Sequence, residues 1–186
     1  MYGINIATMV VRETKRNWKE RRRKKMKSLR VVLVAALALA IAAPSAFAWY
    51  LYWPTSGRIS SVVGWRICPF HGREYHPGTD IAAPGGRRIG SIAAGRVTSA
   101  GWAGGYGKSV NMSHASGYTS RYSHMSSIST RRGAYLASKG KVGAVGTTGS
   151  STGNHLDFGI KRYGSVKAPR CSKGQYKTAG TRIYLR

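Results

Sequence analysis

Two short segments of this chain combine a histidine with an aspartate in an arrangement that suits a metal ion. They are His76-Pro-Gly-Thr-Asp80 and His155-Leu-Asp157. Imidazole nitrogens and carboxylate oxygens are zinc ligands, and three protein ligands leave a fourth position for water, as in catalytic zinc sites. The chain has only five acidic residues beside 31 Lys and Arg, so carboxylates in this setting are unlike ordinary surface residues. The pattern therefore predicts metal-assisted hydrolysis.

The second motif has the alternation of a half-buried strand. Side chains on a strand point alternately to the two faces of a sheet. His155 and Asp157 would face a cleft, while the apolar residues between and after them, Leu156, Phe158 and Ile160, would face the core. The motif is therefore expected on a strand that separates the core from the site.

The first motif needs a different local structure. Pro77-Gly78 interrupts it, and proline cannot donate to a strand ladder. We expect His76 in a tight loop and Asp80 at the start of a strand through residues 81–83. A third histidine, His124, lies in a segment with strand alternation, where we expect Tyr122 on the same face.

Short apolar runs between glycine-rich turns, with no sustained helical period, predict an all-β fold for the rest of the chain. We expect one compact antiparallel β-sheet or sandwich domain after an N-terminal apolar segment. The predicted strands are residues 58–63, 88–93, 95–101, 108–113, 118–125, 141–145, 155–160 and 181–185.

The N-terminal part is organised like an export signal. Residues 1–30 are strongly basic, and translation starting at Met26 would leave an ordinary signal n-region. Residues 31–48 form an apolar run that ends in Ala-Phe-Ala, the small-residue pattern of a cleavage site. The alternative is an uncleaved anchor through residues 31–53. Either arrangement predicts an exported domain at residues 49–186, periplasmic or secreted, or held at the inner membrane.

The net charge of +26 predicts attraction to polyanions. Outside the cytoplasm these are anionic envelope polymers and peptidoglycan, rather than nucleic acid. The basic residues are scattered, with no helical stripe and no regular interleaving of aromatic residues that would stack bases. Specific nucleic-acid binding is therefore not expected. Strongly salt-dependent DNA binding in the absence of metal would favour a nucleic-acid-binding function instead.

The two cysteines suggest a disulfide. Cys68 and Cys171 form an even pair in an oxidising compartment, and a bridge would tie the start of the domain to its end. The alternative is two free thiols.

Seven ordered segments resemble the lysostaphin/LytM-type zinc metallopeptidases, which cut peptide bonds in peptidoglycan. The resemblance covers most of the exported part. Its segments are Gly64-Trp-Arg66, residues 76–85, Ala94-Gly-Arg-Val97, Gly105-Tyr-Gly107, residues 117–125, residues 143–149 and residues 151–158.

The resemblance implies a role for each matching residue. His76, Asp80 and Asp157 would be the metal ligands, with one Zn²⁺ per chain. His124 and His155 would be the catalytic histidines that orient or deprotonate water and stabilise the tetrahedral intermediate. The implied function is an exported zinc-dependent endopeptidase that hydrolyses peptide cross-links of bacterial peptidoglycan.

Asp157 departs from the family pattern, which has histidine at this position. A second carboxylate makes the metal a weaker Lewis acid and makes harder ions such as Mn²⁺ better competitors. The alternative function is accordingly a non-catalytic LytM-like module that binds the cell wall or activates a hydrolase. Such relatives usually lose several ligands, whereas only one position differs here.

Three further polar residues lie outside the motifs. His71 and His114 are expected in loop or surface roles. Glu74 precedes His76 by two residues, but nothing resembles a His-Glu-x-x-His motif, and we expect it at the surface among arginines.

Overall fold

The computed structural model describes Trp18, residues 22–26 and residues 50–186. Residues 22–26 are helical, and Trp49–Arg186 form one compact unit. The leader or anchor predicted at residues 31–48, and most of the basic segment before it, lie outside the described residues. Among the residues described, no helix is long and apolar enough to cross a membrane.

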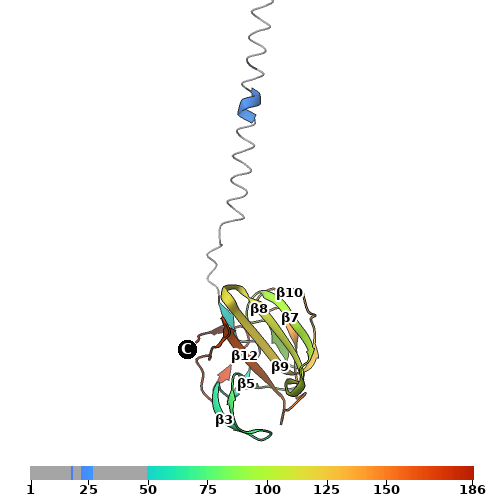
Figure 1. The fold of residues 1–186 in the computed structure, drawn as a ribbon, viewed down its shortest axis with the longest axis vertical. Coiled ribbons are helices and arrows are strands. Elements are labelled where there is room, and N and C mark those ends of the chain that lie inside the picture. Colours follow the sequence, from blue (N-terminus) through green and yellow to red (C-terminus); the bar gives the residue numbers. More distant parts are fainter. Residues whose placement is uncertain (1–17, 19–21, 27–49) are drawn as a thin grey trace, which may run out of the picture. The chain divides into compact units, whose positions relative to one another are not determined.

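The predicted all-β antiparallel fold is confirmed. In residues 50–186 one sheet contains 11 strands, and every segment predicted as a strand overlaps an observed one. Strands β7, β8, β9, β12 and β5 lie side by side (Figure 1). The main path runs through β10 (Tyr135–Leu136), β7 (Gly95–Trp102), β8 (Lys108–His114), β9 (Tyr118–Ile128), β12 (His155–Arg162), β5 (Thr79–Ala82), β2 (Gly57–Ser61) and β14 (Tyr176–Lys177).

Smaller elements extend this sheet or stand beside it. Strand β11 pairs with β6 and β9, and β13 pairs with β12. Two separate two-stranded sheets are formed by β1 with β15, from the two ends of the domain, and by the hairpin of β3 and β4; β3 lies at the lower end of the molecule in Figure 1. The bounds are β1 Leu51–Tyr52, β3 Gly64–Cys68, β4 Gly72–His76, β6 Arg88–Gly90, β11 Lys141–Val145, β13 Ser165–Val166, β15 Arg182–Ile183, and the 3₁₀ turns Gly104–Tyr106 and Ala115–Gly117.

Strand β12 separates the core from the site, as its alternation predicts. Leu156, Phe158 and Ile160 are at most 1% exposed and belong to the hydrophobic core. Asp157, between them, is hydrogen-bonded to Arg121 on the other face, and the neighbouring strand β5 places Asp80 directly opposite it. A polar pair is thereby held on the reverse side of a close-packed apolar layer.

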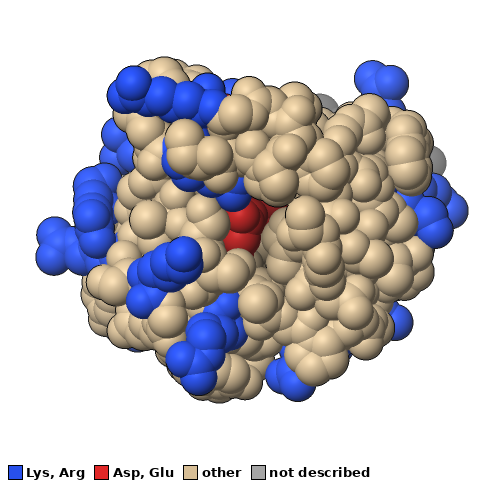
Figure 2. Space-filling model, turned by 90° about the horizontal axis from the view of Figure 1, so that it is seen from below, with Lys and Arg blue, Asp and Glu red and all other residues tan. Residues whose placement is uncertain are grey.

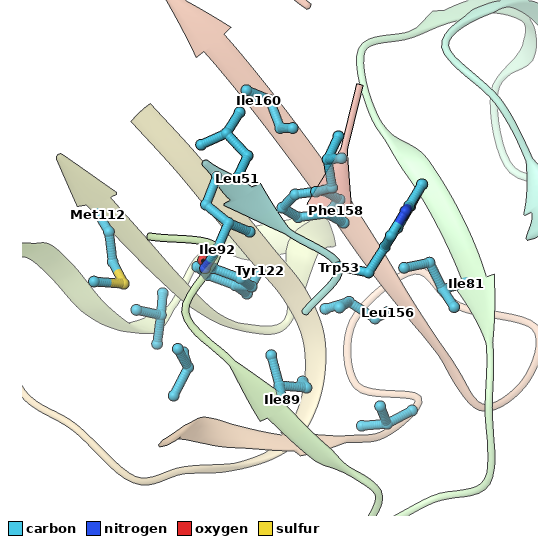
Figure 3. Packing of buried hydrophobic residues seen from close by; sticks show 14 of the residues in the cluster. Leu51, Trp53, Ile81, Ile89, Ile92, Met112, Tyr122, Leu156, Phe158 and Ile160 are labelled. Atoms are coloured by element: carbon cyan, nitrogen blue, oxygen red, sulfur yellow. Dashed lines mark hydrogen bonds between the residues drawn. The ribbon is translucent and has the colours of Figure 1, made fainter. Parts of the chain in front are cut away.

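The core is built by apolar side chains from the sheet and from the segments that cross it. Tyr122 and Phe158 pack with their ring centroids 5.9 Å apart. Leu51, Trp53 and Ile92 cover them from segments outside the central strands (Figure 3). This packing joins the start of the domain to its central strands, so the site rests on a layer that local unfolding cannot readily disturb.

Strand β9 contains a bulge at His124, which corrects the expectation that Tyr122 and His124 share a face. Lys108 pairs with Met125 and Val110 with Tyr122, so β9 has one extra residue there. His124 takes the left-handed conformation, with φ 61°. A bulge re-aims a side chain, so Tyr122 enters the core while His124 turns to the opposite face. Such a conformation in a non-glycine residue often marks a functional site.

The first motif also differs from the expectation. His76 is the last residue of β4 rather than part of a loop, and Asp80 is the second residue of β5. Pro77-Gly78 forms the whole connection between the two strands. The β3–β4 hairpin was not predicted, because its glycines and charged residues obscure the strand pattern.

The predicted disulfide is wrong. Cys68 and Cys171 are both free and buried. Cys171 packs in the hydrophobic core cluster, whereas Cys68 ends β3 and points its sulfur at His71, 3.5 Å away. Burial raises the pKa of the Cys171 thiol. The two thiols belong to different environments, which an even cysteine count cannot reveal.

Replacing Tyr122 with phenylalanine tests the packing beneath the site. The buried hydroxyl accepts the Ile92 N–H at 3.0 Å and is bonded to Ser120 Oγ at 3.0 Å. Tyr122→Phe leaves both partners without this contact and should lower the free energy of unfolding by about 1–3 kcal/mol. Urea denaturation measures the change.

The matched control is Tyr135→Phe, since the Tyr135 side chain is largely exposed. Its loss of stability should stay within about 0.5 kcal/mol. Equal effects of the two substitutions would contradict a structural role for the Tyr122 hydroxyl.

Candidate metal centre

Three predicted metal ligands meet at one point of the structure. His76, Asp80 and Asp157 are all buried, and each offers a ligand atom within 4.8 Å of the others. Antiparallel pairing of β5 with β12 sets Asp80 directly opposite Asp157, and the short turn after β4 returns His76 to the same place. The strand register thus converts two distant motifs into one cluster.

The donor set fits a divalent metal ion. His76 Nε2 and Asp80 Oδ1 lie 3.2 Å apart, and neither forms a hydrogen bond of normal geometry within residues 50–186. Leaving such atoms unpaired in a protein interior is costly. One imidazole and two carboxylates are a legitimate ligand set for zinc and for harder divalent ions, and a shared ion would satisfy all three.

Each carboxylate also has its own arginine. Arg66 donates from Nη1 to Asp80 Oδ2 at 2.6 Å, and Arg121 donates from Nη2 to Asp157 Oδ2 at 2.9 Å. Burial on its own would raise the pKa of Asp80, but the imidazole of His76 and the neighbouring positive charges outweigh it and lower that pKa. The lowered pKa favours the ionised form of Asp80, which is the form that binds a metal ion.

Arg121 is held by two further contacts. Its guanidinium stacks 3.9 Å from the centroid of the Tyr106 ring, and it lies opposite Gly159 across the β9–β12 ladder. The sequence motifs did not indicate either arginine, although both lie within the segments that carry the family resemblance. Their contribution depends on partners far away in the chain.

The two candidate catalytic histidines lie together at the edge of the cluster. The ring centroids of His124 and His155 are 4.7 Å apart. Nδ1 of His124 faces the Thr148 carbonyl at 2.8 Å, and Nδ1 of His155 faces the Gly153 carbonyl at 2.8 Å. A carbonyl requires an N–H partner, so Nδ1 carries the proton and Nε2 keeps its lone pair. His155 Nε2 lies 3.9 Å from Asp80 Oδ1.

Electrostatics favour the neutral form of His124. Burial lowers the pKa of His124, and the neighbouring imidazole of His155 acts in the same direction. A lowered pKa means that the neutral ring, which can accept a proton, persists to lower pH than in a free histidine. His124 therefore has the protonation state that a general base requires.

The centre opens into a groove of about 370 Å³. One wall is the β3–β4 hairpin, and the other carries Tyr106 and Ser150. A second hollow, of about 330 Å³, reaches Asp80 and His155. Figure 2 shows acidic side chains at the bottom of a hollow in this face, with Lys and Arg around it. The described part of the chain thus gathers negative charge in a surface that is otherwise basic.

Other histidines have different surroundings. His114 is half-buried rather than on the surface, with Nδ1 3.0 Å from the Ala94 carbonyl and Nε2 2.8 Å from Ser120 Oγ. Burial lowers the pKa of His114. His71 is exposed on the β3–β4 hairpin. Neither lies in the cluster of His76.

Known proteins similar to this chain are peptidases and a hydrolase activator. The sequence model of peptidase family M23 matches residues 74–169, just over half of the chain. The DD-carboxypeptidase/endopeptidase Mpg of Neisseria meningitidis serogroup B is 39% identical over 113 residues, which are 60% of this chain and 26% of that protein. The murein hydrolase activator NlpD of Escherichia coli K12 is 31% identical over 118 residues, 63% of this chain and 29% of NlpD.

A solved structure has the same fold. A zinc-containing peptidase from Vibrio cholerae superposes with a TM-score of 0.59 at 28% identity, covering 64% of this chain and 39% of the other. The chain spans little more than a quarter of the length of the curated relatives it matches. The similarity therefore concerns one domain of those longer proteins.

Replacing Gly78 with alanine should displace a metal ligand. A Cβ at this position would lie 2.2 Å from Asp157 Oδ1 and 3.3 Å from His76 Cε1. Arg121 and strand β12 hold Asp157 in place, so the clash can be relieved only by moving its carboxylate away from His76 and Asp80. We expect Gly78→Ala to weaken zinc binding roughly 10–100-fold, the range seen when supports of metal ligands are changed, as measured by competition with a chromophoric chelator.

Gly153→Ala is the control, since a Cβ there meets nothing within 4 Å. Its zinc affinity should equal that of the wild type. Unchanged affinity in Gly78→Ala would mean that Asp157 is not a ligand.

Removing Arg121 should destabilise the metal-free chain, because a buried carboxylate loses its positive partner. Arg121→Ala leaves buried Asp157 without its guanidinium partner. Breaking a buried pair costs about 3–5 kcal/mol, and because the Arg121 side chain is 19% exposed we expect the lower end of this range for the metal-free chain. Zinc should then raise the melting temperature more in the variant than in the wild type.

Thermal unfolding with and without zinc measures both effects. Arg131→Ala, at an exposed arginine, should change neither the stability nor the response to zinc. A variant at Arg121 that behaved in the same way would show that the ion pair does not balance the site.

Proposed function

This chain belongs to peptidase family M23, and on that premise we propose that it is an exported, metal-dependent endopeptidase that hydrolyses peptide cross-links of bacterial peptidoglycan. One observation carries the proposal. His76, Asp80 and Asp157 converge within 4.8 Å, beside two histidines whose Nδ1 atoms each face a backbone carbonyl. The Mpg relative is named a DD-carboxypeptidase/endopeptidase, and NlpD is named a murein hydrolase activator. Both names point to the cell wall.

M23 peptidases depend on zinc, and His76, Asp80 and Asp157 are the residues we propose to hold it. When bound, the ion would polarise the scissile carbonyl and lower the pKa of water. All other steps fall to the protein. Arg66 donates to Asp80 through Oδ2 alone, whereas Arg121 Nη2 contacts both oxygens of Asp157, Oδ2 at 2.9 Å and Oδ1 at 3.3 Å. These contacts offset part of the electron donation expected from a second anionic ligand.

His124 and His155 would manage the proton. With Nδ1 bound to a carbonyl, each ring can accept a proton at Nε2 from the attacking water and later donate it to the leaving amine. The protonated ring next to the reacting carbonyl would also stabilise the oxyanion. The lowered pKa of His124 predicts that activity persists to mildly acidic pH, because the neutral ring is the active form.

The surface supports an extended, envelope-bound substrate. Two hollows adjoin the centre, one lined by the β3–β4 hairpin and one by residues 152–155. A peptide could occupy both with its scissile bond between them. Basic side chains lie beside the hollow and elsewhere on this face (Figure 2) and would bind anionic envelope polymers. Export through residues 31–48, by cleavage or by anchoring, belongs to the same proposal.

A second candidate is a wall-binding or hydrolase-activating module without catalysis. Asp157 favours it, since it stands where the family's third metal ligand is usually a histidine, as does the similarity to NlpD. The two candidates share the groove and differ only in chemistry, so a single experiment separates them.

The test is mass spectrometry of the fragments released when the purified full chain is incubated with peptidoglycan, with and without a chelator. We expect chelator-sensitive release of cleaved stem or bridge peptides. Peptidoglycan left intact by a folded, metal-loaded and wall-bound protein would reject the hydrolase and favour the second candidate.

Two variants assign the roles. His155→Ala should lower activity by at least about 100-fold, the usual contribution of a general base, while metal is retained. Asp157→Ala should lower metal affinity and activity together. Lys161→Ala, at an exposed position of the same strand, serves as control and should change neither. Unchanged metal content in Asp157→Ala would refute its assignment as a ligand.

A further inference from the structure

A second cluster of metal-ligand residues lies on the β3–β4 hairpin. Cys68, His71 and Glu74 each offer a ligand atom within 4.8 Å of the other two. Cys68 Sγ lies 3.5 Å from His71 Nδ1, which in turn lies 3.4 Å from Glu74 Oε2. Unlike the first cluster, all three residues come from one hairpin, so their proximity needs no distant strand pairing.

The donor chemistry suits a transition metal such as zinc. A thiolate, an imidazole and a carboxylate are each zinc ligands, and three protein ligands leave one position open. Cys68 is only 7% exposed, but it lines the open groove together with His71 and Glu74. An ion could therefore reach the cluster from the groove.

The placement of Glu74 is unusual for this chain. Residues 50–186 contain only three acidic residues, and the other two are the buried carboxylates of the first centre. Arg66 binds Glu74 Oε1 at 2.9 Å, which leaves Oε2 directed at His71. A metal ion could therefore take Oε2 without breaking the contact with Arg66.

We propose that Cys68, His71 and Glu74 bind a second divalent transition metal ion in the wall of the groove, giving two metal sites per chain. The sequence predicts one ion per chain and a surface role for His71 and Glu74, and this site departs from both expectations. The proposal does not depend on hydrolysis at the first centre.

An ion here would stiffen the hairpin and couple it to the first centre. It would cross-link the end of β3, the turn and β4, and so hold the exposed aromatic rings of Trp65, Phe70 and Tyr75 in one arrangement. Arg66 joins Glu74 to Asp80 through a single guanidinium. Occupancy of the hairpin site would thereby restrain the arginine that balances the first centre.

Cobalt substitution distinguishes the two sites, because only the hairpin cluster contains sulfur. The reduced full chain is titrated with Co²⁺ while its absorption spectrum is recorded. We expect two ions per chain and a thiolate-to-cobalt charge-transfer band in the near ultraviolet. Cys68→Ser should lose the band and one of the two ions. Cys171→Ser, the matched control at the other buried thiol, should keep both.

Further variants keep the test decisive if Cys68→Ser folds poorly. His71→Ala changes an exposed side chain. It should lower the cobalt affinity of the hairpin site, measured from the growth of the band, at least tenfold. His76→Ala should remove one ion and leave the band intact. A wild-type chain without the band, or a band that follows Cys171, overturns the proposal. None of these readouts uses activity, so a failed hairpin site and a failed hydrolase remain distinguishable.

Discussion

Two buried carboxylates that face each other across neighbouring strands impose the main constraint on this structure. Asp80 and Asp157 are paired in the β5–β12 ladder, where like charges repel and burial adds a desolvation cost. They remain there because the guanidinium groups of Arg66 and Arg121 converge on them, with the imidazole of His76 beside Asp80. A divalent ion would complete the same balance. The candidate metal centre thus brings positive groups to two like charges that the strand register places together.

The arginines give the departure at Asp157 a physical context. A carboxylate in place of a neutral imidazole adds one negative charge to the ligand set. The guanidinium of Arg121 supplies one positive charge at 2.9 Å and is itself held on the Tyr106 ring. The substitution is therefore accommodated locally, which is consistent with a working metal site. A metal ion bound by Asp157 would share this carboxylate with Arg121, so the proposed metal affinity would depend on how far the carboxylate can contact both.

The groove lies between two elements of different stability, the large sheet and the β3–β4 hairpin. Its floor is the polar face of the sheet, supported from beneath by Tyr122, Leu156 and Phe158 in the core. Its outer wall is the β3–β4 hairpin, a two-stranded element that packs few apolar side chains and carries exposed aromatic rings. An isolated hairpin is only marginally stable. The wall therefore depends on polar contacts such as those of Arg66, and a metal ion on the hairpin would strengthen the part of the groove that most needs it.

The sequence alone determined the all-β class, most of the strands of the large sheet, the two faces of β12 and the residue types of the centre. These features are local or periodic, so they are readable from neighbours in the chain. Only the tertiary structure decided the arginine partners of the carboxylates, the bulge that turns His124 away from Tyr122, the separation of the two thiols and the convergence of Cys68, His71 and Glu74. The first three depend on register and packing between distant segments, and the last depends on a hairpin whose strands carry little apolar alternation. Spacing could identify candidate ligands, but which charges meet is settled only when the strands pair.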